Sequence, residues 1–547
     1  MCLIGMDVDD PEDDLVGFSI EVQSPGNNTF IPLRNRLNFS YDKPPAKAVK
    51  GSRDYLSTEA PFQKFRWVHF PFMPKSGKYI YRVTKQHMPS DNKLVKGTSL
   101  DVDISLDTII YDDFLDIGFA RNFASSQAYA EKFGNNPDVI PANANDGLNP
   151  KKFKKVPGDV YEWLGFEAYD LIFGFLKEVA EDSSIELDLF AYDFNEPDIL
   201  AALETIARQK RLRAIIDDSG SHKPASSAES QAAKKLAALA GKANVHRMHF
   251  KNLQHNKVLI AKRDGKAFKV LLGSTNFSFR GLYIQANNVL VFHASEAAGL
   301  FEQVFELAFT DPAKFNKDPI SKKWFLVQVS GKPPVHFCFS PHASTDLSLN
   351  PVGGAIEQAT SSVFFSIAFL NQIKSGPTRT AIDGLMGKNV FSYGISDKAG
   401  GLKVKKPDGS IGLVDFSYLA KTAPEPFASE WSGGKGIHEH HKFVVTDFSL
   451  PTAKVFSGSS NLSPAGEGNN GDNLVMIEDC RVATSYAIEA LRVFDHLHFR
   501  SRMQNAPKSK DPLTLQKPTA ISHKPAWFTP FYKPGSQQER DRKLFSH

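Results

Sequence analysis

The chain has 547 residues, of which 41% are hydrophobic and 23% are charged. This composition is typical of a globular protein of several domains, and it excludes a disordered chain, a fibre and a disulfide scaffold. The 65 basic and 61 acidic residues give a formal net charge of +4, so any surface for nucleic acid must be local. Three scattered cysteines, an acidic N-terminal segment and the lack of an 18-residue apolar run predict a cytoplasmic protein without integral membrane association.

The first 106 residues contain short alternating runs separated by Pro and Gly, which predict a small antiparallel β-sandwich. Within this region, a Pro- and Gly-containing turn at 74–78 precedes the sequence YIYRV at 79–83. This segment resembles the penultimate strand of fibronectin type III domains; a generic Tyr-rich strand is the alternative. The sandwich is also a candidate surface for a protein partner.

Residues 107–320 and 321–505 each alternate helices with strands, which predicts two similar α/β units joined by a polar connector over 311–334. In the first unit we expect helices over 159–181, 198–209, 226–239 and 295–308, and strands over 185–192, 212–216, 245–250, 257–261, 268–272 and 288–292. In the second unit we expect helices over 355–359, 378–385 and 483–499, and strands over 363–369, 390–395, 443–446, 454–457 and 474–477.

The remaining residues, 506–547, form a basic tail rich in Pro and in aromatic residues. A solvated linker rarely contains so many aromatic side chains, so we expect this tail to dock on the body of the protein. A role in stacking on nucleic-acid bases is the alternative.

Two short blocks of the same residue types repeat along the chain at a constant offset of 185 positions. Each block has the pattern H-x-K, followed by G-S-x-N and, further on, by another Asn. Several residue types that recur at one offset indicate an internal repeat rather than a coincidence. The residues are His255, Lys257, Ser274 and Asn276 in the first block, and His440, Lys442, Ser459 and Asn461 in the second.

These residue types suit the chemistry of a phosphodiester. A His and a Lys two positions apart at the start of a strand project from one face, and the Gly-Ser turn ends the next strand. Lysines and amides bind the anionic oxygens and stabilise the charge that grows on phosphorus. One imidazole can attack phosphorus while the other protonates the leaving group and then activates water. We therefore expect neither a metal nor another cofactor.

The two blocks resemble the signature of the phospholipase D superfamily, H-x-K-x4-D followed by G-S-x-N, present twice. The second block fits it through Asp447, whereas the first has Lys262 at the equivalent position. In the family this aspartate is mainly structural, so the departure bears on strand packing more than on catalysis. The resemblance implies a pseudo-twofold α/β/α domain with one shared active site, and a metal-independent phosphodiesterase that works through a covalent phosphohistidine.

The family also suggests different roles for the two histidines. Thirteen residues after each Ser, it usually carries an acid that reaches the histidine of the opposite half. Here those positions are Asn287 and Asp472, so by resemblance Asp472 orients His255 and Asn287 orients His440. A carboxylate partner stabilises a positive imidazole, which predicts His255 as the nucleophile and His440 as the general acid. Tyrosyl-DNA phosphodiesterases resemble this asymmetry.

Other interpretations remain open at this point. The basic clusters over 151–155 and 403–406 favour nucleic acid as the substrate, and a phospholipase D acting on phospholipid head groups is the alternative. A binding or structural protein with vestigial catalysis is a third possibility. The run 438–441 could be a metal cluster, although the first half has no counterpart. The additional histidines, His222, His246 and His249, are expected to be surface or core residues.

Overall fold

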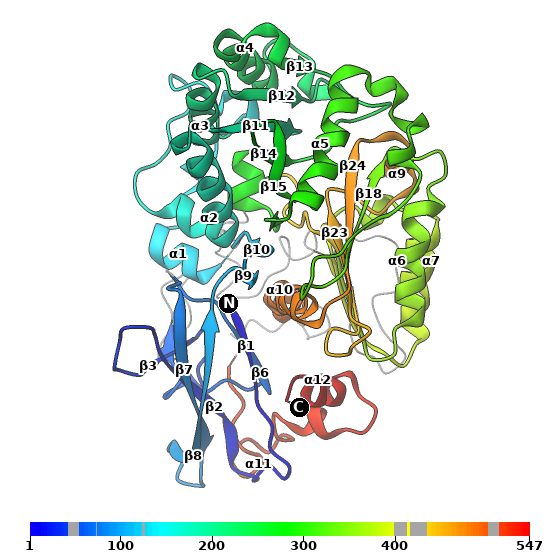
Figure 1. Cartoon of the computed structure of the whole chain (residues 1–547). Helices are drawn as coiled ribbons and strands as arrows, with labels where there is room; N and C mark the ends of the chain where they lie inside the picture. The colour runs from blue at the N-terminus through cyan, green and yellow to red at the C-terminus, as the bar shows by residue number, and fades with distance from the viewer. Residues whose placement is uncertain are drawn as a thin grey trace.

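The computed structural model of the chain describes residues 1–41, 54–72, 74–122, 126–398, 413–415, 435–501 and 514–546 (Figure 1). Within these residues, two eight-stranded mixed sheets form the body of the molecule. Sheet 1 has the strand order β13-β12-β11-β14-β15-β16-β10-β9, and sheet 2 has the order β17-β18-β24-β23-β22-β19-β20-β21. Read from opposite ends, the two orders correspond strand by strand.

The corresponding strands also agree in direction. Strand β11 (Ile185–Ala191) pairs in parallel with β12 and antiparallel with β14, and strand β19 (Ser362–Ile367) pairs in parallel with β20 and antiparallel with β22. Both strands are buried along almost their whole length. This agrees with their mostly apolar sequences, which are typical of strands that are covered on both faces. These two strands therefore occupy equivalent places in the two sheets.

The other strands of the two sheets have the following bounds. Sheet 1 contains β9 (Ile109–Tyr111), β10 (Leu115–Phe119), β12 (Leu212–Ile216), β13 (Val245–Arg247), β14 (Val258–Arg263), β15 (Lys266–Gly273) and β16 (Asn288–Phe292). Sheet 2 contains β17 (Phe325–Val327), β18 (Val335–Ser340), β20 (Phe391–Ser396), β21 (Leu413–Asp415), β22 (Lys442–Thr446), β23 (Lys454–Gly458) and β24 (Asp472–Ile477).

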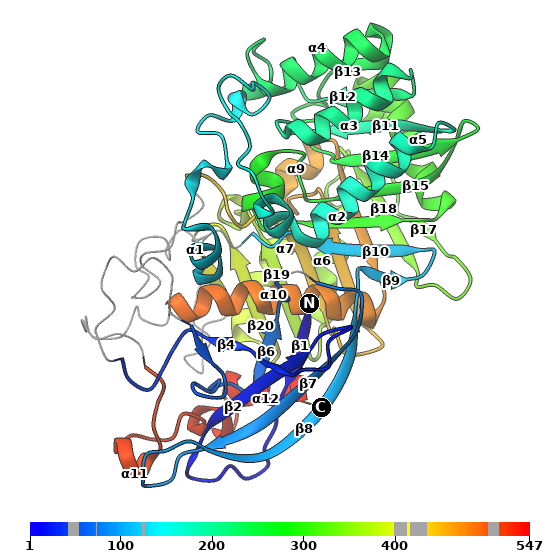
Figure 2. The same ribbon diagram turned by 90° about the vertical axis from the view of Figure 1, so that its left-hand side faces the viewer.

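The helices fall into three layers. The outer helices of each half pack against the outer face of its own sheet, whereas α5 and α10 contribute to a single hydrophobic core that contains residues of both sheets (Figures 1 and 2). The outer helices are α2 (Val160–Glu181), α3 (Pro197–Arg208) and α4 (Ala228–Ala240) in the first half and α6 (Asp346–Gln358) and α7 (Pro377–Gly384) in the second; the central helices are α5 (Ser295–Thr310) and α10 (Cys480–Ser501). This layering packs the two halves into one body.

The N-terminal region is all β, as expected. A four-stranded antiparallel sheet has the order β3-β2-β7-β8, and two short pairs accompany it. Tyr79 lies in the segment that resembles a fibronectin type III strand, and its hydroxyl accepts a hydrogen bond from the backbone N–H of Lys75 at 2.8 Å. The fibronectin type III likeness itself stays a prediction. The strands are β1 (Cys2–Gly5), β2 (Leu15–Gln23), β3 (Ile31–Pro32), β4 (Arg34–Asn35), β5 (Tyr55–Leu56), β6 (Arg66–His69), β7 (Gly77–His87) and β8 (Val95–Leu106).

The described part of the tail, with α11 (Thr519–Ser522) and α12 (Gln537–Ser546), packs against the N-terminal region and against sheet 2. The Trp527 indole N–H donates to the Leu15 carbonyl at 2.9 Å. The Asp541 carboxylate accepts from Arg66 of β6 at 2.7 Å and from the Tyr393 hydroxyl of β20 at 2.9 Å. Aromatic side chains of the tail thus complete the core of the N-terminal sheet.

Some elements differ from the expectations. The segment interpreted as a connector contains strand β17, and strands β9, β10 and β18 were not expected at all. Helix α6 begins at Asp346, whereas the sequence predicted a helix only from 355. The prediction missed the first turns because Pro351 and two glycines interrupt the helical signal. The buried side chains of α6 are nevertheless spaced three and four residues apart. Among the described residues, no helix combines the length and the apolar character needed to cross a bilayer.

Candidate active site

Each repeated block occupies the same position in its sheet. Lys257 immediately precedes β14, and Lys442 begins β22. Gly273 and Gly458 end the following strands with φ values of 142° and 133°. A Cβ at either glycine would lie within 2.5 Å of the backbone oxygen of Asn288 or Asn473, so only glycine permits this turn.

The two blocks meet along one seam between the halves. Residues Gln254 and Gly471 form an isolated parallel bridge across it, and Ala286 and Glu439 form a second one. The backbone N–H of His255 donates to the Gly471 carbonyl at 2.9 Å, and that of His440 donates to the Ala286 carbonyl at 3.2 Å. The bridged residues of one half lie 185 positions from those of the other, so the sequence repeat is also a repeat in space.

Both expected contacts between a histidine and a residue of the opposite half are present. Nδ1 of His255 lies 2.7 Å from Oδ1 of Asp472, and Nδ1 of His440 lies 2.9 Å from Oδ1 of Asn287. The Asn287 amide is oriented by its own N–H donation to the Gly281 carbonyl at 2.8 Å, so its oxygen faces the imidazole. Each histidine therefore donates from Nδ1, which leaves Nε2 as the nitrogen available for chemistry.

The electrostatic environment of the two imidazoles differs. Burial lowers the pKa of His255, Lys257 adds to this effect, and Asp472 opposes it. Burial lowers the pKa of His440 well below its usual value, and Lys442, Lys257 and His255 add to this effect without an opposing carboxylate on His440 itself. His255 is thus the imidazole better able to carry positive charge.

The two lysines are fully enclosed. Burial lowers the pKa of Lys257 to about 8 and that of Lys442 well below the usual range of lysine. Nζ of Lys257 donates to the carbonyl of His255, whereas Nζ of Lys442 lies 2.8 Å from the carbonyl and 3.1 Å from Nε2 of His440. Cationic groups held in such a dry site are strong stabilisers of a developing negative charge.

The hydroxyl of each motif Ser holds the strand that follows in its own half, and that of Ser459 also reaches the partner of His255. The Ser459 hydroxyl donates to Oδ1 of Asp472 at 2.7 Å and accepts from the Asn473 N–H at 3.0 Å. The Ser274 hydroxyl accepts from the Asn288 N–H at 3.0 Å. The structure therefore brings together the histidines, the lysines, Asn287 and Asp472 along the seam. The Oδ1 atoms of Asn276 and Asn461 are buried without a hydrogen-bond partner among the described residues.

An aromatic ring flanks each histidine. Tyr192 follows β11 and lies edge-on to His255 with ring centroids 4.7 Å apart, and Phe369 follows β19 and lies edge-on to His440 at 6.0 Å. Both side chains are only partly buried. The motif analysis did not identify them, because an aromatic residue after a buried strand carries no signal of function in a single sequence.

A second pair of contacts between the halves also escaped the sequence analysis. The Asn473 amide donates to Oδ1 of Asn256 at 2.8 Å, and the Asn288 amide donates to Nδ1 of His441 at 3.3 Å. Nε2 of His441 in turn faces Glu489 at 2.8 Å. His441 is thus engaged in a buried hydrogen-bond network that links β22 to α10.

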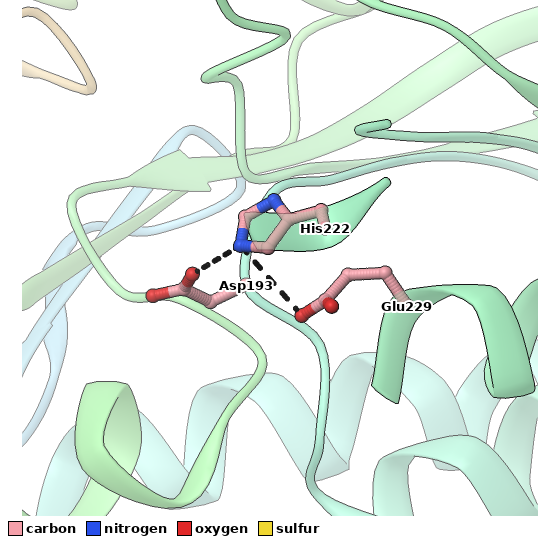
Figure 3. A group of neighbouring side chains, drawn as sticks. All are labelled: Asp193, His222 and Glu229. Carbon is pink, nitrogen blue, oxygen red and sulfur yellow. Dashed lines mark hydrogen bonds and ion pairs between the residues drawn. The ribbon is translucent and has the colours of Figure 1, made fainter. Parts of the chain in front are cut away.

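The metal interpretation of 438–441 is not supported. Only one group of His, Cys, Asp or Glu side chains within the described ranges has the geometry to hold an ion, and it consists of Asp193, His222 and Glu229 (Figure 3). His222, which was expected to be a surface or core residue, is buried in this group.

Asp447 acts at the beginning of a strand, at some remove from the histidines. Its carboxylate accepts from the backbone N–H groups of Thr360, Ser361 and Ser362 at 2.7–3.1 Å, which fixes the start of β19. In the first half, Lys262 instead forms an ion pair with the buried Asp188 at 3.0 Å. The altered signature therefore changes strand packing and leaves the His and Lys of the first block in place.

The basic cluster over 151–155 is partly neutralised. Lys152 pairs with Asp146 at 2.9 Å, and Lys155 pairs with Glu196 at 2.7 Å. The second cluster, over 403–406, lies outside the described residues.

Comparisons with known proteins include one family model that covers the first block. Residues 176–308, which contain the first block, match the family model "Cardiolipin synthase, PLD-like domain". No curated protein matches the sequence. Among solved structures, the chain is similar to phosphatidylserine synthase of Haemophilus influenzae Rd KW20 (14% identity over 69% of this chain and 93% of that one, TM-score 0.41) and to yeast tyrosyl-DNA phosphodiesterase (14% identity, 56% and 85%, TM-score 0.30). It is also similar to polyphosphate kinase of Porphyromonas gingivalis, over 64% of this chain but only 52% of that one, at 11% identity and a TM-score of 0.38.

Proposed function

We propose that this chain, a phosphodiesterase-type enzyme of the phospholipase D superfamily, hydrolyses phosphodiester bonds in nucleic acid without a metal ion and through a covalent phosphohistidine. The observation that carries this proposal is the crossed pairing of the two histidines. His255 faces a carboxylate of the other half at 2.7 Å, and His440 faces an amide at 2.9 Å. Two imidazoles with different partners at one seam suit two different roles in one reaction.

In the first step, Nε2 of His255 attacks phosphorus and the bond from phosphorus to the leaving oxygen breaks. His440 gives its Nε2 proton to that oxygen, and Asp472 stabilises the positive charge on the His255 imidazole. The free enzyme disfavours a protonated His440, because burial and two lysines lower its pKa. A bound phosphodiester brings a negative charge that opposes this effect and equips His440 as an acid.

In the second step, His440 accepts a proton from water, and the water oxygen attacks the phosphohistidine. The bond between nitrogen and phosphorus breaks, which releases a phosphomonoester and restores His255. Lys257, Lys442 and the amides of Asn276 and Asn461 stabilise the charge on the equatorial oxygens in both steps.

Two features support nucleic acid as the substrate. Tyr192 and Phe369 offer partly exposed aromatic faces beside the two histidines, and such rings are suited to stacking on bases. The arrangement of an amide in the first half and an acid in the second resembles tyrosyl-DNA phosphodiesterases. Hydrolysis of phospholipid head groups uses the same chemistry and is the alternative that the experiment must separate.

The test is hydrolysis by the full chain in EDTA, with single-stranded DNA, double-stranded DNA, RNA and phosphatidylcholine vesicles as substrates. The proposal predicts cleavage of at least one nucleic acid at a rate that EDTA does not change. A His255→Asn protein purified in the same way controls for contaminating nucleases. Activity that EDTA abolishes and a divalent ion restores would contradict the metal-independent mechanism, and activity on phosphatidylcholine alone would establish the lipid alternative.

A further inference from the structure

Figure 3 shows an ionic cluster formed by Asp193, His222 and Glu229. The cluster is hydrogen-bonded to the first histidine block, and the proposed reaction uses none of its residues. Its centre is His222, in a short helical turn after β12, whose side chain is 8% exposed. Nε2 of His222 lies 2.9 Å from Oδ1 of Asp193 and 3.8 Å from Oε1 of Glu229, and Nδ1 lies 2.8 Å from Oδ2 of Asp217. Three carboxylates therefore surround one imidazole.

This arrangement fixes the charge of His222. A carboxylate only accepts hydrogen bonds, so an imidazole with a carboxylate at each ring nitrogen must donate from both and is an imidazolium. Burial opposes that charge, but the hydrogen bonds to Asp193 and Asp217 outweigh it and raise the pKa of His222 to about 10. His222 is thus a permanent cation at neutral pH.

The cluster is connected to the active site at two points. The second oxygen of Asp193 accepts from the Asn276 amide at 3.0 Å, and Asn276 belongs to the first G-S-x-N turn. The second oxygen of Asp217 accepts from the backbone N–H of Gln254 at 2.7 Å, one residue before His255. The His222 imidazolium thus holds two carboxylates, of which one accepts from Asn276 and the other from the backbone just before His255.

The orientation of the Asn276 amide follows from this connection. Because Asp193 is an acceptor, the NH2 group of Asn276 must face it, and the amide cannot turn over without placing oxygen against oxygen. The side chain is 1% exposed, and its Oδ1 has no hydrogen-bond partner in the described part of the chain. One N–H of this NH2 group donates to Asp193, and the second N–H remains as a donor for a bound phosphate.

The second half lacks this device. Backbone N–H groups of Asp217 and Asp397 donate to the carbonyls of Ala191 and Ala368, at 3.0 and 3.3 Å, so these residues are counterparts. Two residues after Ala368 stands the fully buried Leu370, at the place of Asp193. Asp397 still accepts from the backbone before His440, but in the described residues no carboxylate holds Asn461 as Asp193 holds Asn276.

We propose that His222 is a positioning residue of the first half: through Asp193 and Asp217 it fixes the Asn276 amide and the entry to the His255 strand, so that a phosphate is held in line with His255. The inference rests on the proposed function. If it holds, the two halves differ in the residues that orient the motif Asn as well as in the partners of their histidines.

A bound cation is the competing interpretation of the same cluster, because the ligand atoms of Asp193, His222 and Glu229 all lie within 4.8 Å of one another. A metal requires a deprotonated imidazole, however, and the two carboxylates at the ring nitrogens stabilise the protonated form. Metal analysis of the purified protein therefore forms part of the test.

The experiment compares His222→Gln and Asp193→Asn with wild-type protein, and uses His249→Gln as the matched control. His249 forms a neighbouring ion pair with Asp218 at 2.6 Å, but its side chain is 44% exposed and it contacts neither Asn276 nor Gln254 in the structure. Two quantities are measured: kcat/KM on the best phosphodiester substrate, and the affinity for inorganic phosphate by calorimetry. The thermal midpoint of each variant shows whether it is folded.

The proposal predicts that His222→Gln and Asp193→Asn each lower kcat/KM and phosphate affinity by roughly 10-fold to 100-fold, the usual scale for a residue that orients another ligand-binding group. The double variant should be no worse than the more damaged single one, because both act through Asn276. His249→Gln should change both quantities less than about twofold. Asp193→Asn, at a side chain that is 41% exposed, keeps the test valid if His222→Gln fails to fold.

Unchanged phosphate affinity in folded His222→Gln and Asp193→Asn would overturn the positioning role. Stoichiometric zinc or manganese in the purified wild-type protein, lost on His222→Gln, would also overturn it in favour of a metal site. Phosphate affinity is measured without turnover. A chain that hydrolyses no diester but shows the predicted loss of phosphate affinity therefore contradicts the proposed function and leaves this inference standing.

Discussion

The two halves share one framework but differ in the residues that surround it. Both have the same strand order, the same glycine turn and the same His, Lys, Ser and Asn at an offset of 185 positions. Asp472 stands where the first half has Asn287, and Asp193 stands where the second half has Leu370. In the proposed reaction the shared residues form a symmetric phosphate site, so we attribute the different roles of the two histidines to their neighbours.

The largest expected effect separates the two histidines. His255→Asn removes the nucleophile and should lower hydrolysis by roughly 10⁴-fold or more. With a p-nitrophenyl phosphodiester, whose leaving group needs no acid, His440→Asn should still release a burst of nitrophenol, whereas His255→Asn should release none. A burst from His255→Asn instead would reverse the two roles.

Removal of either lysine should cost less. Lys257→Met or Lys442→Met should lower kcat by roughly 10²–10³-fold, the usual scale for one group that stabilises transition-state charge. The two values should be similar, because both ammonium groups serve the symmetric part of the site. A loss below tenfold for either variant, measured in folded protein, would show that the lysine lies outside the phosphate site.

The partner residues should have a smaller and directional effect. Asp472→Asn removes the carboxylate that opposes the lowering of the His255 pKa, so that pKa should fall further. Attack requires neutral His255, and the acid limb of the kcat/KM profile should therefore move to lower pH. The maximal rate should also fall, because no carboxylate stabilises the positive imidazole. Asn287→Asp should leave that limb in place. A shift of the limb to higher pH in Asp472→Asn would contradict the assigned pair.

The smallest effect concerns stability. Hydrogen bonds to Asp193 and Asp217, opposed by burial, raise the pKa of His222 from 6.5 to about 10 in the folded chain. The stabilisation linked to this proton is complete below about pH 6.5 and is lost as the pH rises through about 10. The thermal midpoint of His222→Gln should therefore differ from that of wild type most at about pH 6 to 6.5 and least above pH 10. A difference that grows above pH 10 would contradict the charged state of His222.

The sequence predicted the parts of the fold that carry strong local patterns. Buried strands such as 288–292 coincide with the structure, since a continuous apolar run between turn signals specifies them well. One end of each sheet was missed. It consists of β10 and β9 beyond β16 in sheet 1, and of β18 and β17 beyond β24 in sheet 2, and the places of these strands depend on pairing with distant residues. The strands β9 and β17 have three residues each, which is too short for a local pattern to assign them.

The candidate site shows the same limit. The repeat at 185 positions identified the residues that are duplicated, and the family resemblance identified the crossed partners Asn287 and Asp472. His222 and Asp193 have no counterpart in the repeat and lie 29 residues apart in sequence, so only the fold shows that they meet. Features that distinguish the halves are therefore harder to find from sequence than those that unite them.

The central claim is that His255 alone forms the covalent intermediate. Wild-type protein and His440→Asn are reacted with a phosphodiester that carries a label in the phosphate that remains on the enzyme. The reaction is stopped with denaturant, and the protein is kept at alkaline pH, where phosphohistidine survives. It is then digested for peptide mapping. The account predicts that the label lies on the peptide that contains His255 in both proteins and that it accumulates in His440→Asn. Label on the peptide that contains His440, with His255→Asn still able to form the adduct, would contradict it.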